Sequence, residues 1–258
     1  MRELTLVLPF FVNSGMFLEQ QAVWASYPAE LRSRLHVVVV DDCSPKGFRL
    51  SAKAVQIEGL ASLRLYRLTK KKRWNWLACR NLGAKVATTE WLLLTDIDHT
   101  IPAETMARLL NGPLDAESAY KFKRVTAPSA WPYDVAAAAP WKPHNDTWLL
   151  TKAMFDLSGG YDERLSGHYG TSGEFSDRVV AASRSVVLMT DVIVRYPREV
   201  IADASTPPEV YTRKNDPVND AGLAKAKAER AKIAGWRPLH GLIPYEQVYP
   251  IVEAERVA

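Results

Sequence analysis

The sequence predicts an α/β protein with a Rossmann-like, mostly parallel central sheet flanked by helices. Two apolar runs support this prediction: residues 35–40 are rich in β-branched side chains, and residues 91–94 are Trp-Leu-Leu-Leu. Each run leads within two residues into a pair of acids, and a segment with helical spacing lies between the runs. Strands that alternate with helices favour a doubly wound sheet, whose ligands bind at the carboxyl ends of the strands.

The other elements follow from apolar spacing along the chain. Residues 4–10 form an apolar first strand that contains a proline near its end, and residues 16–27 place Phe17, Val23 and Trp24 at helical spacing. The first half is completed by a strand at 63–68 and a helix at 75–87. Beyond Asp98 we expect a helix at 103–110, a strand at 120–125, a long loop rich in Pro and Ala at 127–145, a segment at 149–157, a helix at 174–183, strands at 185–189 and 192–196, and a helix at 221–234.

Composition indicates an ordinary globular protein. The chain has 258 residues, of which 47% are hydrophobic and 24% are charged, and its formal net charge is +4. It contains no apolar run long enough to cross a bilayer, and the N-terminal residues enter a strand pattern at once, without the features of a signal peptide. Cys43 and Cys79 are far apart and form no metal-type pair. We therefore expect a cytoplasmic protein with reduced cysteines.

The positive charge is concentrated in two places. Residues 70–73 read Lys-Lys-Lys-Arg and precede two tryptophans, and further basic residues occur at Lys225, Lys227, Arg230 and Lys232. Basic residues interleaved with aromatics can bind phosphates or nucleic acid. Such a run is more often a solvated loop, and the sequence alone favours that interpretation.

Asp96 and Asp98 follow the apolar run at 91–94 with one residue between them. At the carboxyl end of a strand the chain leaves the sheet, so both carboxylates can approach one hard cation together with substrate phosphates. An Asp-rich turn is the simpler alternative, because Asp is common in turns.

Five short stretches, in this order, are similar to family 2 glycosyltransferases of the GT-A fold. They are Thr-Leu-Val-Leu-Pro at 5–9, Val-Val-Val-Asp-Asp-Cys-Ser at 38–44, Ala-Cys-Arg-Asn-Leu-Gly at 78–83, Leu-Leu-Thr-Asp-Ile-Asp at 93–98 and Gly-Gly-Tyr-Asp-Glu at 159–163. Each motif is weak by itself, but the five together cover roughly residues 4–180. The resemblance implies a GT-A-type fold with a C-terminal helical or irregular extension. It also implies an inverting transfer of sugar from a nucleoside-diphosphate sugar, which we expect to be a UDP-sugar.

The resemblance also implies which residues hold the donor. The base is expected near Pro9, Phe11 and Asp42, with Asp41 beside it, because a carboxylate accepts an imide N–H and an aromatic ring stacks on the base. Arg80 and Asn81 correspond to a pair placed near the base and diphosphate. Asp96 and Asp98 correspond to the Asp-x-Asp motif that holds Mn²⁺ or Mg²⁺, with Asp98 favoured for direct ligation.

The catalytic base and a third metal ligand are less well defined by the sequence. The family carries a Glu-Asp pair at a helix start, whereas this chain has Glu174 followed by Phe175. Glu174 is therefore the first candidate for the base and Asp177 the second. His168 and His240 are candidates for the third ligand, and His99 could be one or could simply lead into the next helix.

The resemblance suggests a transferase domain at residues 1–204, with a nucleotide-sugar half at 1–98 and an acceptor half at 99–204. Residues 205–258 form an extension that could act as a lid through Arg213, Lys214 and Asn215. The acceptor could be a saccharide, a glycoconjugate or a modified base in DNA. The alternatives are a non-catalytic sugar-nucleotide- or nucleic-acid-binding module and a sugar nucleotidyltransferase, although the Gly-rich, Arg-containing loop of the latter is absent after residues 7–9. The oligomeric state stays open.

Overall fold

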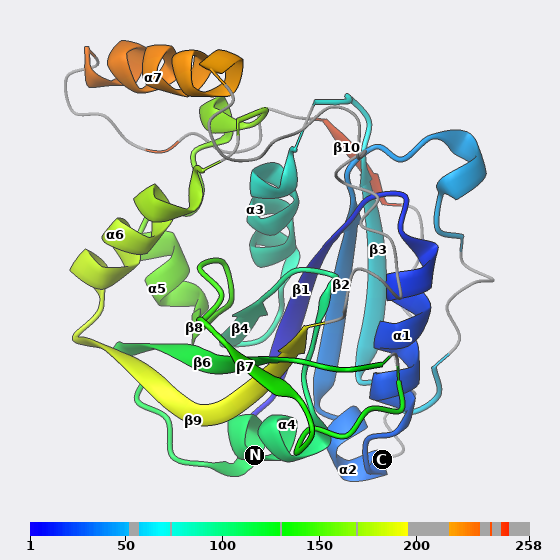
Figure 1. Ribbon diagram of the computed structural model, residues 1–258. Helices are drawn as coiled ribbons and strands as arrows, with labels where there is room; N and C mark the ends of the chain where they lie inside the picture. The colour runs from blue at the N-terminus through cyan, green and yellow to red at the C-terminus, as the bar shows by residue number, and fades with distance from the viewer. Residues whose placement is uncertain are drawn as a thin grey trace.

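The computed structural model describes residues 1–51, 57–72, 74–129, 131–168, 170–195, 217–232, 238 and 244–247. It confirms the α/β fold class, with one large sheet and helices on both of its faces (Figure 1). The described strands lie in the order β10-β3-β2-β1-β4-β8-β6-β9-β5, and β7 pairs with β6. Within the described residues, no helix has both the length and the apolar character needed to cross a bilayer.

The N-terminal half of the sheet is built on four parallel strands, whose order is β3-β2-β1-β4. Their bounds are Leu4–Phe10 (β1), Leu35–Asp41 (β2), Ser62–Leu68 (β3) and Trp91–Leu94 (β4). Side chains of a strand alternate between the two faces, so a continuous apolar run can bury both. In β1, Leu6 and Leu8 pack in the cluster that includes α1, whereas Val7 belongs to the cluster on the opposite face.

Helices cover both faces of this half. Helix α1 (Ser14–Ala25) lies on one face, with the short helices α2 (Ala29–Arg32) and η1 (Lys46–Phe48) in the connections that follow it. Helix α3 (Trp76–Val86) covers the other face. Gly83 of α3 lies so close to β1 that a Cβ atom there would overlap a methyl group of Val7. This close approach fixes the position of α3 and of its residues Arg80 and Asn81.

The second half continues the same sheet from β4, with antiparallel pairing throughout its described strands except between β6 and β9, which are parallel. Its strands are β5 (His99–Thr100), β6 (Ser118–Thr126), β7 (Ala139–Trp141), β8 (Trp148–Thr151) and β9 (Ser185–Arg195). Its helices are α4 (Ala103–Asn111), α5 (Lys152–Leu157), η3 (Glu163–Leu165) and α6 (Ser172–Ala182). Because β8 pairs with β4, no gap in the sheet separates the two halves, and the division at residue 98 stays a prediction.

Three details differ from the sequence predictions. The strands expected at 185–189 and 192–196 form a single strand, β9, whose register with β6 shifts between Lys121 and Lys123. The loop expected at 127–145 contains β7, which pairs with the end of β6. The segment 149–157 divides into β8 and α5, because the Thr151 side chain accepts a hydrogen bond from the Met154 amide and so caps the helix.

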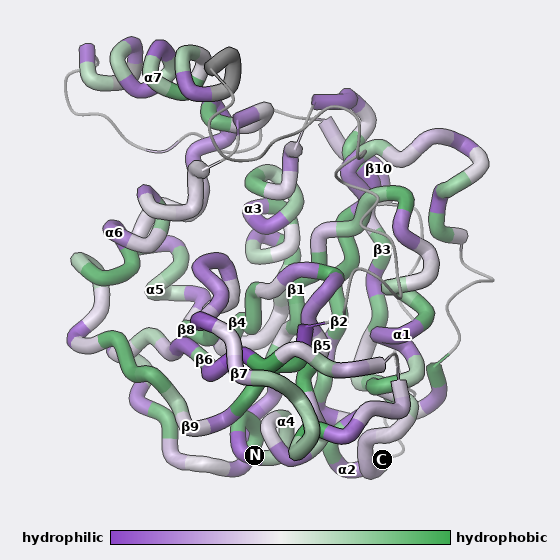
Figure 2. Tube along the Cα trace, in the orientation of Figure 1, coloured by the Kyte–Doolittle hydropathy of each residue, from purple (hydrophilic) through white to green (hydrophobic). Residues whose placement is uncertain are grey.

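The C-terminal region contributes helix α7 (Pro217–Ala231) and strand β10 (Tyr245–Gln247). The sequence predicted the helix but not the strand, which pairs antiparallel with β3. In Figure 2, α7 alternates hydrophobic and hydrophilic residues, and its Leu223 and Ala226 pack against the core cluster of α5 and α6. The residues of the predicted lid, 213–215, and His240 lie outside the described residues.

Candidate functional site

Polar side chains gather where β1, β2 and β4 end, at the carboxyl edge of the parallel strands. Three non-glycine residues in the segments next to this edge have positive φ: Val12 at 61°, Cys43 at 55° and Trp74 at 44°. Such backbone is unfavourable for β-branched and bulky residues and is concentrated at functional sites. The edge is therefore the first place to look for a ligand site, as expected for an open α/β sheet.

The two neighbouring acids at the end of β2 have different surroundings. Both carboxylate oxygens of Asp41 are used inside the protein, since Oδ1 accepts from the Ser44 amide at 2.9 Å and Oδ2 from Arg67 Nε at 3.0 Å. Asp42 Oδ2 accepts from the Asn75 amide at 3.0 Å, whereas Oδ1 is buried without a hydrogen-bond partner. Burial raises the pKa of Asp42 to about 7. Asp42 can thus receive a ligand N–H, and Asp41 shapes the turn beside it.

Phe11 and Lys71 lie together next to Asp42. Lys71 Nζ is 3.5 Å from the centroid of the Phe11 ring and donates to the Asp42 carbonyl at 3.1 Å. Pro9, at the end of β1, is partly exposed on the same edge. At least one lysine of the basic run therefore faces this pocket rather than forming part of a flat basic surface, and Arg73 lies outside the described residues.

Arg80 is completely buried at the centre of the site. It forms an ion pair with Asp96, lies 3.4 Å from Asp146, donates to the Tyr161 hydroxyl at 3.2 Å and stacks over Trp76 at 4.6 Å. Burial alone would lower the pKa of Arg80, but Tyr161 and the two acids raise it above its ordinary value. The guanidinium is therefore a permanent cation that holds these acids in place.

Asn81 bridges α3 to the Gly-Gly-Tyr-Asp-Glu segment. Its Nδ2 donates to the Tyr161 carbonyl at 2.7 Å and to Glu163 Oε1 at 3.0 Å, and its Oδ1 accepts from the Tyr161 amide at 2.8 Å. These bonds explain why the two motifs occur together in the sequence. They give Asn81 a structural role, where the resemblance implied contact with the donor.

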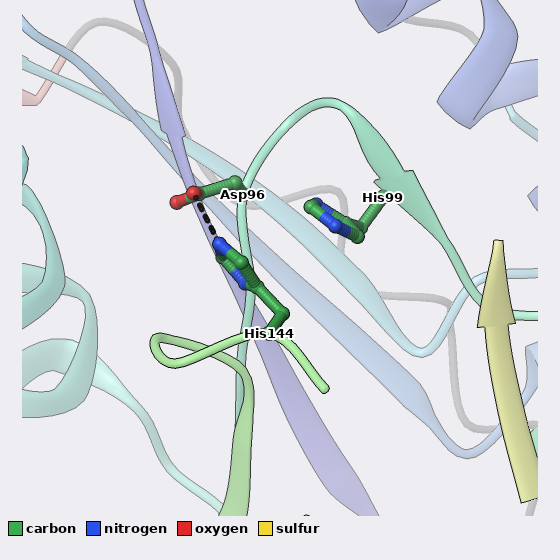
Figure 3. A group of neighbouring side chains, drawn as sticks. All are labelled: Asp96, His99 and His144. Carbon is green, nitrogen blue, oxygen red and sulfur yellow. Dashed lines mark ion pairs between the residues drawn. The ribbon is translucent and has the colours of Figure 1, made fainter. Parts of the chain in front are cut away.

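Asp96, His99 and His144 form a cluster that could hold a metal ion (Figure 3). One ligand atom from each residue lies within 4.8 Å of the others, and the two imidazoles are stacked at 4.3 Å. His144 Nε2 lies 3.3 Å from Asp96 Oδ2. Asp98, which we expected to bind the metal directly, lies instead 2.7 Å from His99 Nδ1. His99 is thus part of the cluster and not only a residue that leads into the next helix.

The surroundings of the two imidazoles fit a metal site. Metal-binding histidines usually have a polar partner on their second ring nitrogen, and here His144 Nδ1 lies 2.8 Å from Thr147 Oγ1 while His99 Nδ1 faces Asp98. Burial lowers the pKa of His144 well below its ordinary value, which favours the neutral form that a metal requires. His99 Nε2 lies 3.2 Å from Arg124 Nη1, so a cation at that nitrogen would displace the guanidinium.

The pKa values of Asp96 and of the neighbouring Asp98 are shifted in opposite directions. Burial raises the pKa of Asp96 to about 6, and the neighbouring acids Asp98 and Asp146 add to this effect while Arg80 opposes it. Burial also acts on Asp98, but His99 outweighs it and holds the pKa of Asp98 well below its usual range. Asp98 is therefore an anion that orients His99.

Sequence reasoning predicted the long loop at 127–145 but missed His144 within it. This loop is fixed by Lys121, whose Nζ donates to the carbonyls of His144, Asn145 and Thr147 at 2.7 to 3.1 Å and lies 3.7 Å over the Trp148 ring. Burial lowers the pKa of Lys121 to about 7. The one available signal was the long Pro- and Ala-rich segment, because long loops in compact domains are often functional.

The candidate bases lie on α6. Phe175 is buried and stacks on Tyr161 at 3.9 Å, so the aromatic ring belongs to the core. Glu174, in the first turn, is partly buried with Lys227 Nζ at 4.0 Å, whereas Asp177 is exposed. Of the two, Glu174 has the more enclosed position. His168 is not in the metal cluster; a Cβ atom at Gly222 of α7 would overlap its ring.

Comparison with known proteins relates part of this chain to one family. Residues 19–130 match the model of the family described as glycosyl transferase family 2. Comparison with the sequences of curated proteins gave no match. Several solved structures are similar to this chain in fold.

Staphylococcus aureus TarS 1–349 in complex with UDP-GlcNAc aligns with a TM-score of 0.56 and 16% identity, over 76% of this chain and 59% of that chain. The mannosyltransferase PcManGT from Pyrobaculum calidifontis, in complex with GDP-Man and Mn²⁺, aligns with a TM-score of 0.54 and 18% identity, over 92% of this chain and 66% of that chain. GalNAc-T7 with UDP, GalNAc and Mn²⁺ aligns with a TM-score of 0.54 and 14% identity, over 80% of this chain and 46% of that chain.

The alignments cover about three fifths of TarS 1–349 and less than half of GalNAc-T7. At these identities the solved structures show the fold alone. The chain therefore has the GT-A fold, and its residues 19–130, less than half of the chain, are similar to glycosyl transferase family 2.

Proposed function

We propose that this protein is a metal-dependent, inverting glycosyltransferase that moves a sugar from a nucleoside-diphosphate sugar, preferably a UDP-sugar, to an acceptor hydroxyl. The observation that carries the proposal is the meeting of two sites on one sheet edge. Asp42, which has a carboxylate oxygen without a hydrogen-bond partner among the described residues, directly follows β2, and Asp96 of the Asp96–His99–His144 cluster follows β4. A base held at the first site would direct its diphosphate along the edge toward the second.

The residues of the second site suit a divalent cation. One carboxylate and two imidazoles form a mixed oxygen and nitrogen set, which favours Mn²⁺ over Mg²⁺ because Mg²⁺ prefers oxygen ligands alone. Bound there, the cation supplies charge neutralisation at the departing nucleoside diphosphate. Mn²⁺ accompanies the donor or nucleotide in the structures of PcManGT and GalNAc-T7.

Glu174 is the proposed general base. The start of α6 is tied to the site, because Ser172 Oγ donates to Asp146 Oδ2 at 2.6 Å and Asp146 lies 3.4 Å from Arg80. A carboxylate in this first turn can accept the proton of an acceptor hydroxyl as that oxygen attacks the anomeric carbon. Direct displacement of the nucleoside diphosphate inverts the configuration at that carbon.

The acceptor is best described as a saccharide or a glycoconjugate. The basic run at 70–73 offered the main argument for DNA, but Lys71 is turned onto Phe11 and Asp42. A nucleic-acid acceptor therefore has no separate support from the described residues.

Incubation with a panel of sugar nucleotides and Mn²⁺ tests the proposal. We expect slow release of nucleoside diphosphate from one donor, and loss of this release in an Asp96→Asn variant that remains folded. Release of pyrophosphate would indicate a nucleotidyltransferase, and binding without turnover would indicate a non-catalytic module. Either result would overturn the proposal.

A further inference from the structure

Asn75, immediately before α3, is completely buried, yet neither atom of its side-chain amide has a hydrogen-bond partner among the described residues. The usual reason for Asn at this position is absent, because its side chain makes no capping bond to α3. Asn13 occupies the equivalent position of α1 and does cap its helix, accepting from the Met16 amide at 3.0 Å. The burial of the Asn75 amide therefore needs another explanation.

An unpaired buried amide is costly. Leaving such a group without partners costs about 1–3 kcal/mol, and exceptions in native proteins are few. The position of Asn75 suggests a function for this unpaired amide. Its backbone amide donates to Asp42 Oδ2 at 3.0 Å, which places the residue beside the other unpaired group of this edge, Asp42 Oδ1. Asp42 and Asn75, which are neighbours in space, thus provide a carboxylate oxygen and a side-chain amide that have no hydrogen-bond partner among the described residues.

Lys71 lies between Phe11 and Asp42. Its ammonium is 3.5 Å from the Phe11 ring centroid, 3.8 Å from Asp42 Oδ2 and 3.1 Å from the Asp42 carbonyl, and the side chain is about half exposed. A base that stacks on Phe11 would take the place of this ammonium. Its hydrogen-bonding edge would then meet Asp42 and Asn75.

We propose that Asn75 selects the base of the donor together with Asp42. Asp42 Oδ1 accepts the ring N–H of the base, and Asn75 Nδ2 donates to the carbonyl group next to that N–H. Uracil and guanine share this N–H and C=O edge, whereas cytosine and adenine present a ring nitrogen that is an acceptor and an amino group that is a donor. The inference rests on the proposed function, because it identifies the base recognised at that site.

The test compares nucleotide affinities of the wild type and an Asn75→Ala variant. Dissociation constants of UDP, GDP, CDP and ADP would be measured by calorimetry in the presence of Mn²⁺. We expect the wild type to bind UDP or GDP more tightly than CDP and ADP. Comparison of the UDP and GDP dissociation constants then shows which base is recognised. In the variant, affinity for the preferred nucleotide should fall about tenfold to hundredfold, while that for CDP changes about threefold or less.

Thermal unfolding separates base selection from a structural role. Removing an unpaired buried amide should leave the melting temperature of the ligand-free variant unchanged or higher. Asn111→Ala is the matched control, because Asn111 accepts from Arg34 Nη1 at 2.9 Å away from the site and should not affect nucleotide binding. An unchanged ratio of UDP or GDP to CDP affinity in Asn75→Ala would overturn the inference, with or without a lower melting temperature.

The outcomes also distinguish this inference from the proposed function. If the wild type binds no nucleoside diphosphate, both are wrong. If the wild type binds and turns over a sugar nucleotide while Asn75→Ala keeps the same base preference, the proposed function stands and only the role of Asn75 is lost.

Discussion

Replacing Asp42 by Asn should stabilise the ligand-free protein at alkaline pH while it weakens nucleotide binding. Burial raises the pKa of the carboxyl from 3.8 to about 7. Between these two values the folded protein holds a proton that the unfolded chain has released, so the free energy of unfolding falls as the pH rises through this window. Above about pH 7 the Asp42 carboxyl of the folded protein is ionised, and the full desolvation cost of this buried carboxylate lowers the free energy of unfolding.

The shift from 3.8 to about 7 corresponds to at most about 4 kcal/mol. Of this, about 3 kcal/mol falls between about pH 5 and about pH 8. An amide is neutral throughout, so the Asp42→Asn variant avoids this cost. A change of 1 kcal/mol moves the melting temperature of a chain of this size by about 2–4 °C. The rise in melting temperature of Asp42→Asn over the wild type should therefore be larger at about pH 8 than at about pH 5, by about 5–10 °C.

Scanning calorimetry of the wild type and the variant at both pH values measures the effect. Asp156→Asn is the control: Asp156 is exposed and pairs with Lys152 at 3.2 Å, so its replacement should change stability little and equally at both pH values. Affinity for the preferred nucleoside diphosphate should fall at least about tenfold in Asp42→Asn, because the amide oxygen is a weaker acceptor than a carboxylate. An equal change in melting temperature at the two pH values would refute the assignment of a raised pKa to Asp42.

Three further substitutions test other parts of the site and fold. Arg80→Met removes a buried cation from the partly buried Asp96 and Asp146 and should lower the free energy of unfolding by about 1–3 kcal/mol in urea titrations, whereas unchanged stability contradicts its central role. His144→Ala should weaken Mn²⁺ binding at least about tenfold, as measured by electron paramagnetic resonance. The control His168→Ala, outside the cluster, should leave Mn²⁺ binding unchanged, and equal losses of affinity in the two variants would be inconsistent with the cluster. Gly83→Ala should cost about 1–3 kcal/mol by overpacking α3 against β1, and a neutral result would mean that the helix can shift.

The sequence predicted the parallel half of the fold closely because three of its four strands, β1, β2 and β4, are mostly continuous apolar runs. Residues 35–40, for example, have one interpretation only, since a β-branched run of this length must be buried on both faces. β10 could not be predicted in the same way. It is three residues long and is held by pairing with β3 and by Glu246, which accepts from Arg67 Nη1 at 3.2 Å. Such contacts depend on which distant segment reaches the edge strand.

The site was predictable only where its residues are adjacent in sequence. Asp96 and Asp98 follow one strand, so their proximity was evident, but their separate roles depend on His144, Arg80 and His99 around them. His144 comes from a loop 45 residues beyond His99, and apart from the length and composition of that loop nothing in the sequence marks it. The site residues that the resemblance implied stay predictions, and the structure adds His144 to them as a candidate metal ligand.

Phe175 illustrates how the core of this protein constrains its chemistry. Its ring stacks on Tyr161, whose hydroxyl accepts from Arg80, and that arginine already balances Asp96. A carboxylate in place of the ring would be buried against Tyr161, and the neighbouring Arg80 is already paired with Asp96. The aromatic residue is thus compatible with the packing of α6 in a way that a buried acid is not. Our proposal that Glu174 is the base agrees with this packing, because Glu174 is next to Phe175 in the first turn of α6 and is only partly buried.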